Sequence, residues 1–194
     1  TMARIGDDNL ITFTKHLGEY FRFVTRNSSD NIPLADEINH ARVYTQIQLM
    51  RFSKRLQVEF PELPERYNKL NVPRLILQPV IENAFEHGIE KKKNNGLIRI
   101  NFEGNEEELS IIVEDNGDDI SDNVMENLKQ TLDYSGDGVE TTGIINIHRR
   151  IRLVFGDESG IQVSRSELGG FKVITSVNYS VLIWLKKGQG ENIA

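Results

Sequence analysis

The chain has 194 residues, a mass of 22.2 kDa and a formal net charge of −6 at pH 7, from 29 acidic and 23 basic side chains. That length suffices for one well-filled core, and the absence of cysteine excludes disulfide scaffolds and thiolate metal sites. The acidic balance, with Lys91–Lys93 as a single short basic run, argues against nucleic acid as a partner.

Two helices are predicted at the N-terminal end. Residues Asp7–Arg26 carry an apolar seam at three- and four-residue steps, made of Leu10, Phe13, Leu17, Tyr20 and Val24. A polar break at Asn27–Asn31 follows, and Pro33 is predicted to open a second helix with Ile38, Ala41, Thr45, Leu49 and Phe52 on one face. A short loop between two helices makes an antiparallel hairpin. This small hairpin cannot bury its seam alone, so we expect a homodimer through Leu10, Phe13, Leu17 and Val24.

The most informative stretch is Val72–Gly88, which reads Val-Pro-Arg-Leu-Ile-Leu-Gln-Pro-Val-Ile-Glu-Asn-Ala-Phe-Glu-His-Gly. Its apolar stripe predicts a helix, with Asn83 and His87 on a second, polar face because they are four residues apart. Pro79 must open or kink this helix, and Gly88 is a natural C-terminal stop. An Asn/His pair alone would indicate only a buried helix whose polar groups satisfy the backbone.

Alternating residues predict strands on both sides of this helix. A short strand is expected at Arg55–Phe60, and Leu97–Glu103 with Leu109–Asp115 predicts a β-hairpin. Asp115-Asn116-Gly117 ends the second of these strands. A carboxylate at the end of a buried strand can be held rigidly at a pocket floor, although most Asp-Asn-Gly sequences are turns.

The C-terminal half predicts two more helices and a hairpin. Ser121–Leu132 has Val124, Leu128 and Leu132 at intervals of four, and Gly143–Phe155 has an apolar face of Ile144, Ile147, Ile151 and Phe155. Asp133–Thr142, between them, lacks periodicity and predicts a loop, after which a free helix N-terminus favours an anion. Ile161–Ser166 and Phe171–Val177 predict a second hairpin, and the tail Asn178–Ala194 has no assigned role.

The run Pro73–Gly88 resembles the N box of the LytS/YesM-like sensor histidine kinases. This resemblance implies the GHKL fold, an α+β two-layer sandwich, with the helical hairpin in residues 1–53 and an ATP-binding catalytic domain in 54–194. It also implies that Asn83 helps hold Mg²⁺ on the nucleotide phosphates and that His87 lines the phosphate side.

Further motifs of the family extend the resemblance along the chain. Asp115 stands where the family's aspartate accepts a hydrogen bond from the adenine amino group, with Gly117 in its turn. Asp133–Thr142 occupies the place of the ATP lid. Thr142-Gly143-Ile144-Ile145-Asn146 resembles the second glycine box, which assigns Gly143 and Asn146 to nucleotide binding.

The resemblance implies a two-component sensor histidine kinase. Tyr44-x-x-Ile47-x-x-x-Arg51-Phe52 resembles the segment after the phosphoacceptor helix. The family carries its acceptor in His-Phe-x-Phe-Asn, a context that none of His16, His40, His87 and His148 has, so no catalytic residue is assigned. The expected function is binding Mg-ATP for phosphoryl transfer to a histidine upstream of this chain. The expected partners are a second copy, a response regulator, and the sensor and membrane segments of a longer protein.

The expected location of this part is cytoplasmic. No apolar run approaches the roughly 18–20 residues that a membrane span needs, and no signal-peptide pattern opens the chain. Glu82 could be proposed as a base by analogy with GHKL ATPases, but its spacing from Asn83 favours a structural role.

Three positions depart from the family pattern and leave an alternative open. Asp119 and Thr141 replace glycines of the two glycine boxes, and Glu86 replaces a common lysine. Two of these changes add a negative charge near the expected phosphates, each worth roughly 1–4 kcal/mol at effective dielectric constants of 80 to 20. The alternative is a degenerate nucleotide-binding protein or a non-catalytic signalling and dimerisation module.

Overall fold

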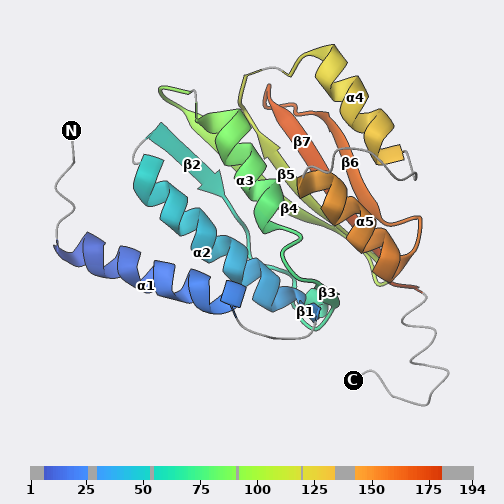
Figure 1. Cartoon of the computed structure of the whole chain (residues 1–194), viewed down its shortest axis with the longest axis horizontal. Coiled ribbons are helices and arrows are strands. Elements are labelled where there is room, and N and C mark those ends of the chain that lie inside the picture. Colours follow the sequence, from blue (N-terminus) through green and yellow to red (C-terminus); the bar gives the residue numbers. More distant parts are fainter. Residues whose placement is uncertain are drawn as a thin grey trace.

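The computed structural model describes residues 7–25, 30–52, 55–90, 92–118, 120–133 and 143–180. Two long helices, α1 (Asp7–Thr25) and α2 (Leu34–Phe52), lie side by side at one edge of the molecule (Figure 1). The predicted helical hairpin is therefore confirmed. It precedes a sheet whose helices lie on one side.

The sheet has five strands in the order β2–β4–β5–β7–β6. These strands are β2 (Leu56–Glu59), β4 (Gly96–Gly104), β5 (Glu108–Asp115), β6 (Gly160–Arg165) and β7 (Phe171–Asn178). β2 is parallel to β4, and the other neighbours are antiparallel. Both predicted hairpins, β4–β5 and β6–β7, are confirmed.

One face of the sheet is apolar and covered, and the other is mainly polar, with Ile112 and Ile174 as apolar neighbours on it. The covered face carries buried side chains from three neighbouring strands, including Ile98, Ile100, Ile111, Val113 and Val173. On the opposite face Arg99 pairs with Glu59 at 2.6 Å, and the hydroxyls of Ser110 and Ser176 lie 3.2 Å apart. This alternation is what a half-buried sheet requires. The fold is thus the expected α+β two-layer sandwich.

The N-box segment begins later than predicted. Asn71–Pro73 form a short strand, β3, which pairs antiparallel with β1 (Asn31–Pro33). The helix proper is α3 (Gln78–Asn83), and it continues directly as a π-helical segment, η3 (Ala84–Ile89). Pro79 opens α3, since a first-turn residue needs no N–H partner. A helix from Val72 and a stop at Gly88 were both wrong, because Gly88 lies inside the π-helical segment.

Two further helices complete the helical layer. They are α4 (Asp122–Asp133) and α5 (Gly143–Phe155), and the inward-facing residues predicted for α5 are all buried. In α4, Met125 and Leu132 are buried, whereas Val124 is 56% exposed. The predicted stripe was wrong at Val124 because steps of four residues advance by about 40° each and drift off one face. A 3₁₀ turn, η2 (Glu65–Tyr67), lies between β2 and β3.

A single hydrophobic core joins α2, α3, η3, α4, α5 and the covered sheet face. The predicted inner face of α2 is confirmed, with Leu49 partly buried and the others fully so. Among the described helices, none has the length and apolar character needed to cross a bilayer.

Candidate functional site

Asp115, the last residue of β5, is a buried carboxylate that backbone groups hold in place. Its side chain is 2% exposed. Its Oδ1 accepts hydrogen bonds from the Gly117 N–H at 2.7 Å and from the Phe171 N–H at 3.3 Å. Burial raises the pKa of the Asp115 carboxyl, and these two N–H groups and the charge of Lys92 oppose part of that rise. The carboxylate is therefore fixed at the end of the central strand, as predicted.

Three glycines surround this carboxylate. A Cβ on Gly88 would lie 2.5 Å from the Asp115 Cγ, and one on Gly170 would lie 2.2 Å from Oδ1. A Cβ on Gly117 would lie 2.4 Å from the Gly88 carbonyl oxygen. Distances this short are sterically forbidden, so glycine is required at all three positions. We call Asp115, Gly88, Gly117 and Gly170 the glycine cradle. Its floor is backbone, and its one functional group is a carboxylate.

Gly170 was missed in the sequence. Gly169-Gly170 separates two strands and there indicates only a turn. Its position beside Asp115 follows from the pairing of β7 with β5, which places the start of β7 next to the end of β5. Strand order is a long-range property, and a local pattern does not contain it.

The N-box helix connects the glycine cradle to the start of α5. At one end Gly88 touches Asp115, and at the other a Cβ on Gly143 would lie 3.6 Å from the Pro79 Cβ. At 1.5 Å per residue, the length of helix from Pro79 to Gly88 separates the two ends by about 13 Å. Asn83 lies between them and is half-buried. The helix can therefore carry groups for the base at one end and for the phosphates at the other.

Asn83 and His87 differ in how far they are buried. Asn83 is half-buried at the end of α3, whereas His87 is exposed in η3. Their common polar face stays a prediction. At the start of α5, Gly143 and Asn146 are both exposed and lie one turn apart, where free N–H groups favour an anion. Asp119, Thr141 and most of the predicted lid lie outside the described residues.

Glu82 lies on the side of α3 that faces α2. Burial, together with the charge of Glu86, raises the pKa of the Glu82 carboxyl. Burial and the charge of Glu82 likewise raise the pKa of the Tyr44 phenol on α2. Glu86 itself is exposed, next to His87. The electrostatic effect of Glu82 on Tyr44 agrees with the structural role expected for Glu82.

A buried glutamate of the hairpin holds the turn before the N-box helix. Glu37, on α2, is fully buried, and its two oxygens accept from the N–H groups of Leu75 at 2.9 Å and Leu77 at 3.0 Å. Leu75 has a φ of +56°, which is uncommon for a residue with a side chain. From α5, Arg150 donates to the Arg74 carbonyl oxygen of the same turn at 2.6 Å. The sequence did not single out Glu37, because an acidic residue in a first helical turn is ordinary.

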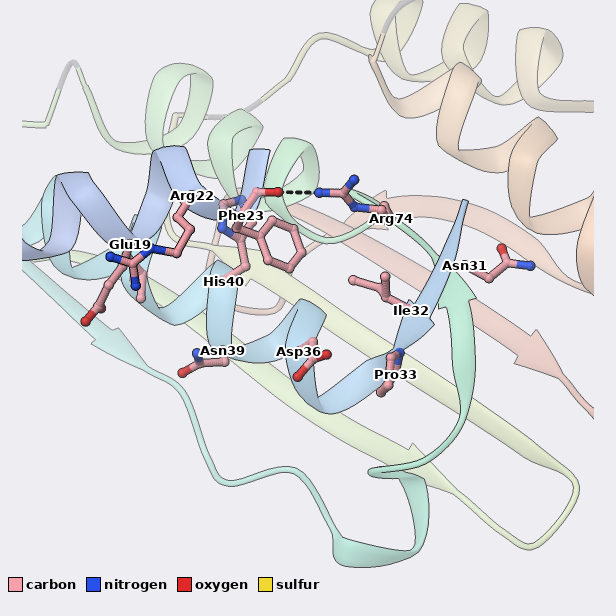
Figure 2. A pocket seen from close by; sticks show the side chains of 11 residues that line it. Glu19, Arg22, Phe23, Asn31, Ile32, Pro33, Asp36, Asn39, His40 and Arg74 are labelled. Carbon is pink, nitrogen blue, oxygen red and sulfur yellow. Dashed lines mark hydrogen bonds between the residues drawn. The ribbon is translucent and has the colours of Figure 1, made fainter. Parts of the chain in front are cut away.

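A pocket of about 460 Å³ lies away from these residues, between α1, β1 and α2. Figure 2 shows its lining, in which Arg74 and His40 stand close to Phe23. None of Asn83, His87, Asp115, Gly117, Gly143 and Asn146 lines it. The nucleotide assignment therefore rests on the glycine cradle and the N-box helix, and this pocket is a different feature.

Comparison with known proteins identifies the family. The family model described as histidine kinase matches residues 1–56. The sensor histidine kinase BtsS of Escherichia coli K12 is 32% identical over 151 residues, which cover 77% of this chain and 24% of BtsS. The sensor protein LytS of Streptococcus agalactiae is 25% identical over 193 residues, which cover 98% of this chain and 32% of LytS. The chain thus spans about a quarter to a third of these relatives.

Solved structures agree on the fold. The ATP-binding domain of PrrB from Mycobacterium tuberculosis has a TM-score of 0.52 at 17% identity, covering 78% of this chain and 98% of that one. Histidine kinase ThkA, in complex with the response regulator protein TrrA, also has a TM-score of 0.52 at 17% identity, covering 89% and 48%. The chain belongs to the sensor histidine kinases, and its sheet and helices form the GHKL-type catalytic fold of that family.

Proposed function

We propose that this chain binds Mg-ATP along the N-box helix and supplies the γ-phosphoryl group to a histidine outside the present sequence. The glycine cradle carries this proposal, because it presents one buried carboxylate at the end of the N-box helix opposite the α5 N-terminus. In the reaction a bond from phosphorus to an imidazole nitrogen forms while the bond to the ADP oxygen breaks. Such transfer depends mainly on positioning and on neutralising charge, so no general base is needed from this chain.

Each predicted residue receives a role in that complex. Asp115 accepts from the adenine amino group, and Gly117 allows the close approach of Gly88 at this end of the site. His87, Gly143 and Asn146 belong to the phosphate side. Among the described residues no three carboxylate or imidazole side chains gather as a metal site. Mg²⁺ takes few protein ligands and several from phosphates, so the metal would enter with the nucleotide and be held by Asn83.

Replacing Asn83 with Ala should weaken Mg-ATP by roughly 10- to 100-fold, the loss typical of a group that orients a metal site. Binding of adenosine, or of ATP in the presence of EDTA, should hardly change, because Asn83 acts through the metal. Titration calorimetry with and without Mg²⁺ measures both. Asn101→Ala, on the polar face of the sheet, is the matched control. An equal loss under both conditions would contradict the metal role.

The alternative, a non-catalytic signalling module, draws support from Glu86. Its carboxylate is exposed beside His87, where it would repel nucleotide phosphates. On this alternative the protein binds no ATP in the same calorimetry, including as the Asp119→Gly variant, which removes the second added charge. Detectable ATP binding by the unmodified chain favours the kinase.

The partners proposed for this chain are a second copy and a response regulator. The complex of ThkA with TrrA supports a response regulator as a partner.

The exposed apolar side chains of α1 support a second copy as a partner. They are Leu10, Ile11, Phe21 and Val24, which are 52%, 67%, 54% and 40% exposed. Of the predicted dimer seam, Phe13 and Leu17 are instead half-buried, so the outward face consists of the four exposed residues. These exposed apolar side chains lie in two groups, at the start and near the end of α1, and exposed apolar surface of this kind is typical of an interface.

Phe21→Glu should convert a dimer into a monomer, because it places a charge among the exposed apolar residues near the C-terminal end of α1. Light scattering at increasing protein concentration measures the mass. Leu153→Glu is the matched control, since Leu153 is an 85% exposed apolar residue on α5. A monomeric, non-aggregating unmodified protein would refute the proposed dimer. So would an equal effect of both variants.

A further inference from the structure

Helix α2 shares its core with the five-stranded sheet, the N-box helix, α4 and α5, which together we call the nucleotide-binding unit after its proposed function. Leu34, Ile38 and Ala41 of α2 are buried in the core that also holds α3 and the sheet. The Phe52 ring stacks on Phe85 of η3 with a centroid separation of 5.9 Å. Just before α2, β1 pairs with β3 of the N-box segment. Separating α2 from this unit would therefore open the main core of the protein.

Buried polar contacts reinforce the same junction. The Glu37 carboxylate has no exposed surface, and moving α2 away would strand it and the N–H groups of Leu75 and Leu77 without partners. In the middle of α2, Arg42 donates to the carbonyl oxygens of Phe60 and Pro61, just after β2, at 3.2 and 2.6 Å. Polar contacts thus join α2 both to the turn before the N-box helix and to the segment after β2.

Helix α1 is attached differently. From Asn9 to Thr25, every described side chain of α1 is half-buried or exposed. Tyr20 and Phe23 stack on His40, with ring centroids 5.1 and 4.0 Å away. The Gln78 amide donates to the Tyr20 hydroxyl at 2.9 Å, and the Arg74 guanidinium donates to the Phe23 carbonyl oxygen (Figure 2). α1 thus reaches the N-box segment through polar contacts at its last turns.

Gln78 is placed to pass a displacement of α1 to the nucleotide site. It is the first residue of α3, and its side chain is buried. Its oxygen lies 2.7 Å from the His40 Nε2, while its amide nitrogen binds Tyr20. Because the Gln78 oxygen can only accept, the His40 Nε2 donates to it, and the Gln78 amide is held from both helices. Rotation of α1 would therefore pull on the helix that carries Asn83.

We propose that α2 moves as one body with the nucleotide-binding unit, that the mechanical joint lies between α1 and α2, and that Tyr20 and Gln78 are positioning residues. The division expected from the sequence, residues 1–53 and 54–194, stays a prediction. Docking of α1 and binding of nucleotide both act on the N-box helix, so each must affect the other by the same factor. This second part rests on the proposed function, whereas the rigid-body part does not.

Spin labels test the rigid body directly, because the chain has no cysteine to remove. One pair, Gln46→Cys with Lys129→Cys, joins α2 to α4, and the other, Lys15→Cys with Lys129→Cys, joins α1 to α4; all three positions are exposed. Dilution with unlabelled chain removes distances between subunits. Tyr20→Phe should shift or broaden the α1–α4 distances and leave the α2–α4 distances unchanged. A parallel change in both pairs, or in neither, would overturn the proposal.

Calorimetry with ATP tests the coupling. Tyr20→Phe should change the Kd by roughly 5-fold or more, the lower end of typical coupling. Tyr179→Phe is the matched control, because it removes a hydroxyl that binds the distant Asn105 carbonyl oxygen. Equal affinities for the two variants would refute the coupling. If the unmodified chain binds no ATP, the proposed function fails. Hydrogen exchange at the N–H groups of Leu75 and Leu77 then tests the coupling. Exchange that is faster in Tyr20→Phe but not in Tyr179→Phe supports it, and equal exchange in the two variants refutes it.

Discussion

Replacing Asp115 with Asn should weaken ATP binding by about 1.5–3 kcal/mol, the range for a hydrogen bond to a charged group, or roughly 10- to 150-fold in Kd. The amide oxygen can still accept from Gly117 and Phe171, so the fold of the glycine cradle is kept. The new NH₂ group then faces the adenine amino group, and two donors cannot pair. The loss should be the same with and without Mg²⁺, which separates it from that of Asn83→Ala. Titration calorimetry under both conditions measures it.

The pH dependence gives this prediction a second readout. The pKa of the Asp115 carboxyl is raised, so as the pH falls this group takes up its proton earlier than an ordinary aspartate. The protonated form loses an acceptor, and ATP affinity should therefore decline as the pH falls through that raised value. Asp115→Asn should lack this decline, whereas Asp157→Asn, an exposed partner of Arg152, should retain it. ATP binding that is indifferent to Asp115 would place the nucleotide elsewhere.

Replacing Glu37 with Ala should destabilise the protein by about 3–5 kcal/mol, the cost typical of breaking a buried charged network. The change leaves the N–H groups of Leu75 and Leu77 without their acceptor and removes a carboxyl group whose charge acts on Arg150. The turn also loses the contact that holds Leu75 at positive φ. Urea unfolding followed by circular dichroism measures the free energy of unfolding.

Two variants bracket this stability effect. Glu37→Gln keeps one carbonyl oxygen as an acceptor, so its loss should be smaller than that of Glu37→Ala. Glu62→Ala removes a 92% exposed ion-pair partner of Arg42 and should cost less than about 1 kcal/mol. Similar losses for Glu37→Ala and Glu62→Ala would mean that the buried carboxylate contributes little to stability.

Periodic elements and the long N-box motif could be predicted from the sequence, because their signals are local. The two β-hairpins and α5 repeat an apolar side chain often enough to reveal which face is buried, and the Asp115 position follows from the end of such a strand. β1 and β3 have three residues each, too few for any period, and they exist only because they pair with each other. The roles of Glu37 and Gly170 could not be predicted for the same reason, since each depends on contacts with residues far along the chain.

The dimer seam shows the limit of helical periodicity. The sequence shows an apolar stripe made of Leu10, Phe13, Leu17, Tyr20 and Val24. It does not show which of these side chains face α2 and which face outward. Tyr20 turns inward because Gln78 offers its buried amide, which is a contact across 58 positions of the chain. Leu10 and Val24, near the two ends, remain outside.

The π-helical segment Ala84–Ile89 makes the site depend on how tightly one helix is wound. The Glu90 N–H donates to the Phe85 carbonyl oxygen five residues back, at 2.9 Å, so this last part of the N-box helix holds one residue more than an α-helical turn would. Rewinding it as an α-helix would rotate the residues beyond it by about 100°, the angle of one residue. Gly88 would then leave the Asp115 carboxylate, and the side chain of His87 or Ile89 would point at a space where a Cβ cannot fit. The glycine cradle, where we propose that adenine binds, therefore depends on the number of residues in this turn as well as on their types. Losing one residue from the turn would disrupt the cradle even if every residue proposed to bind the nucleotide were kept.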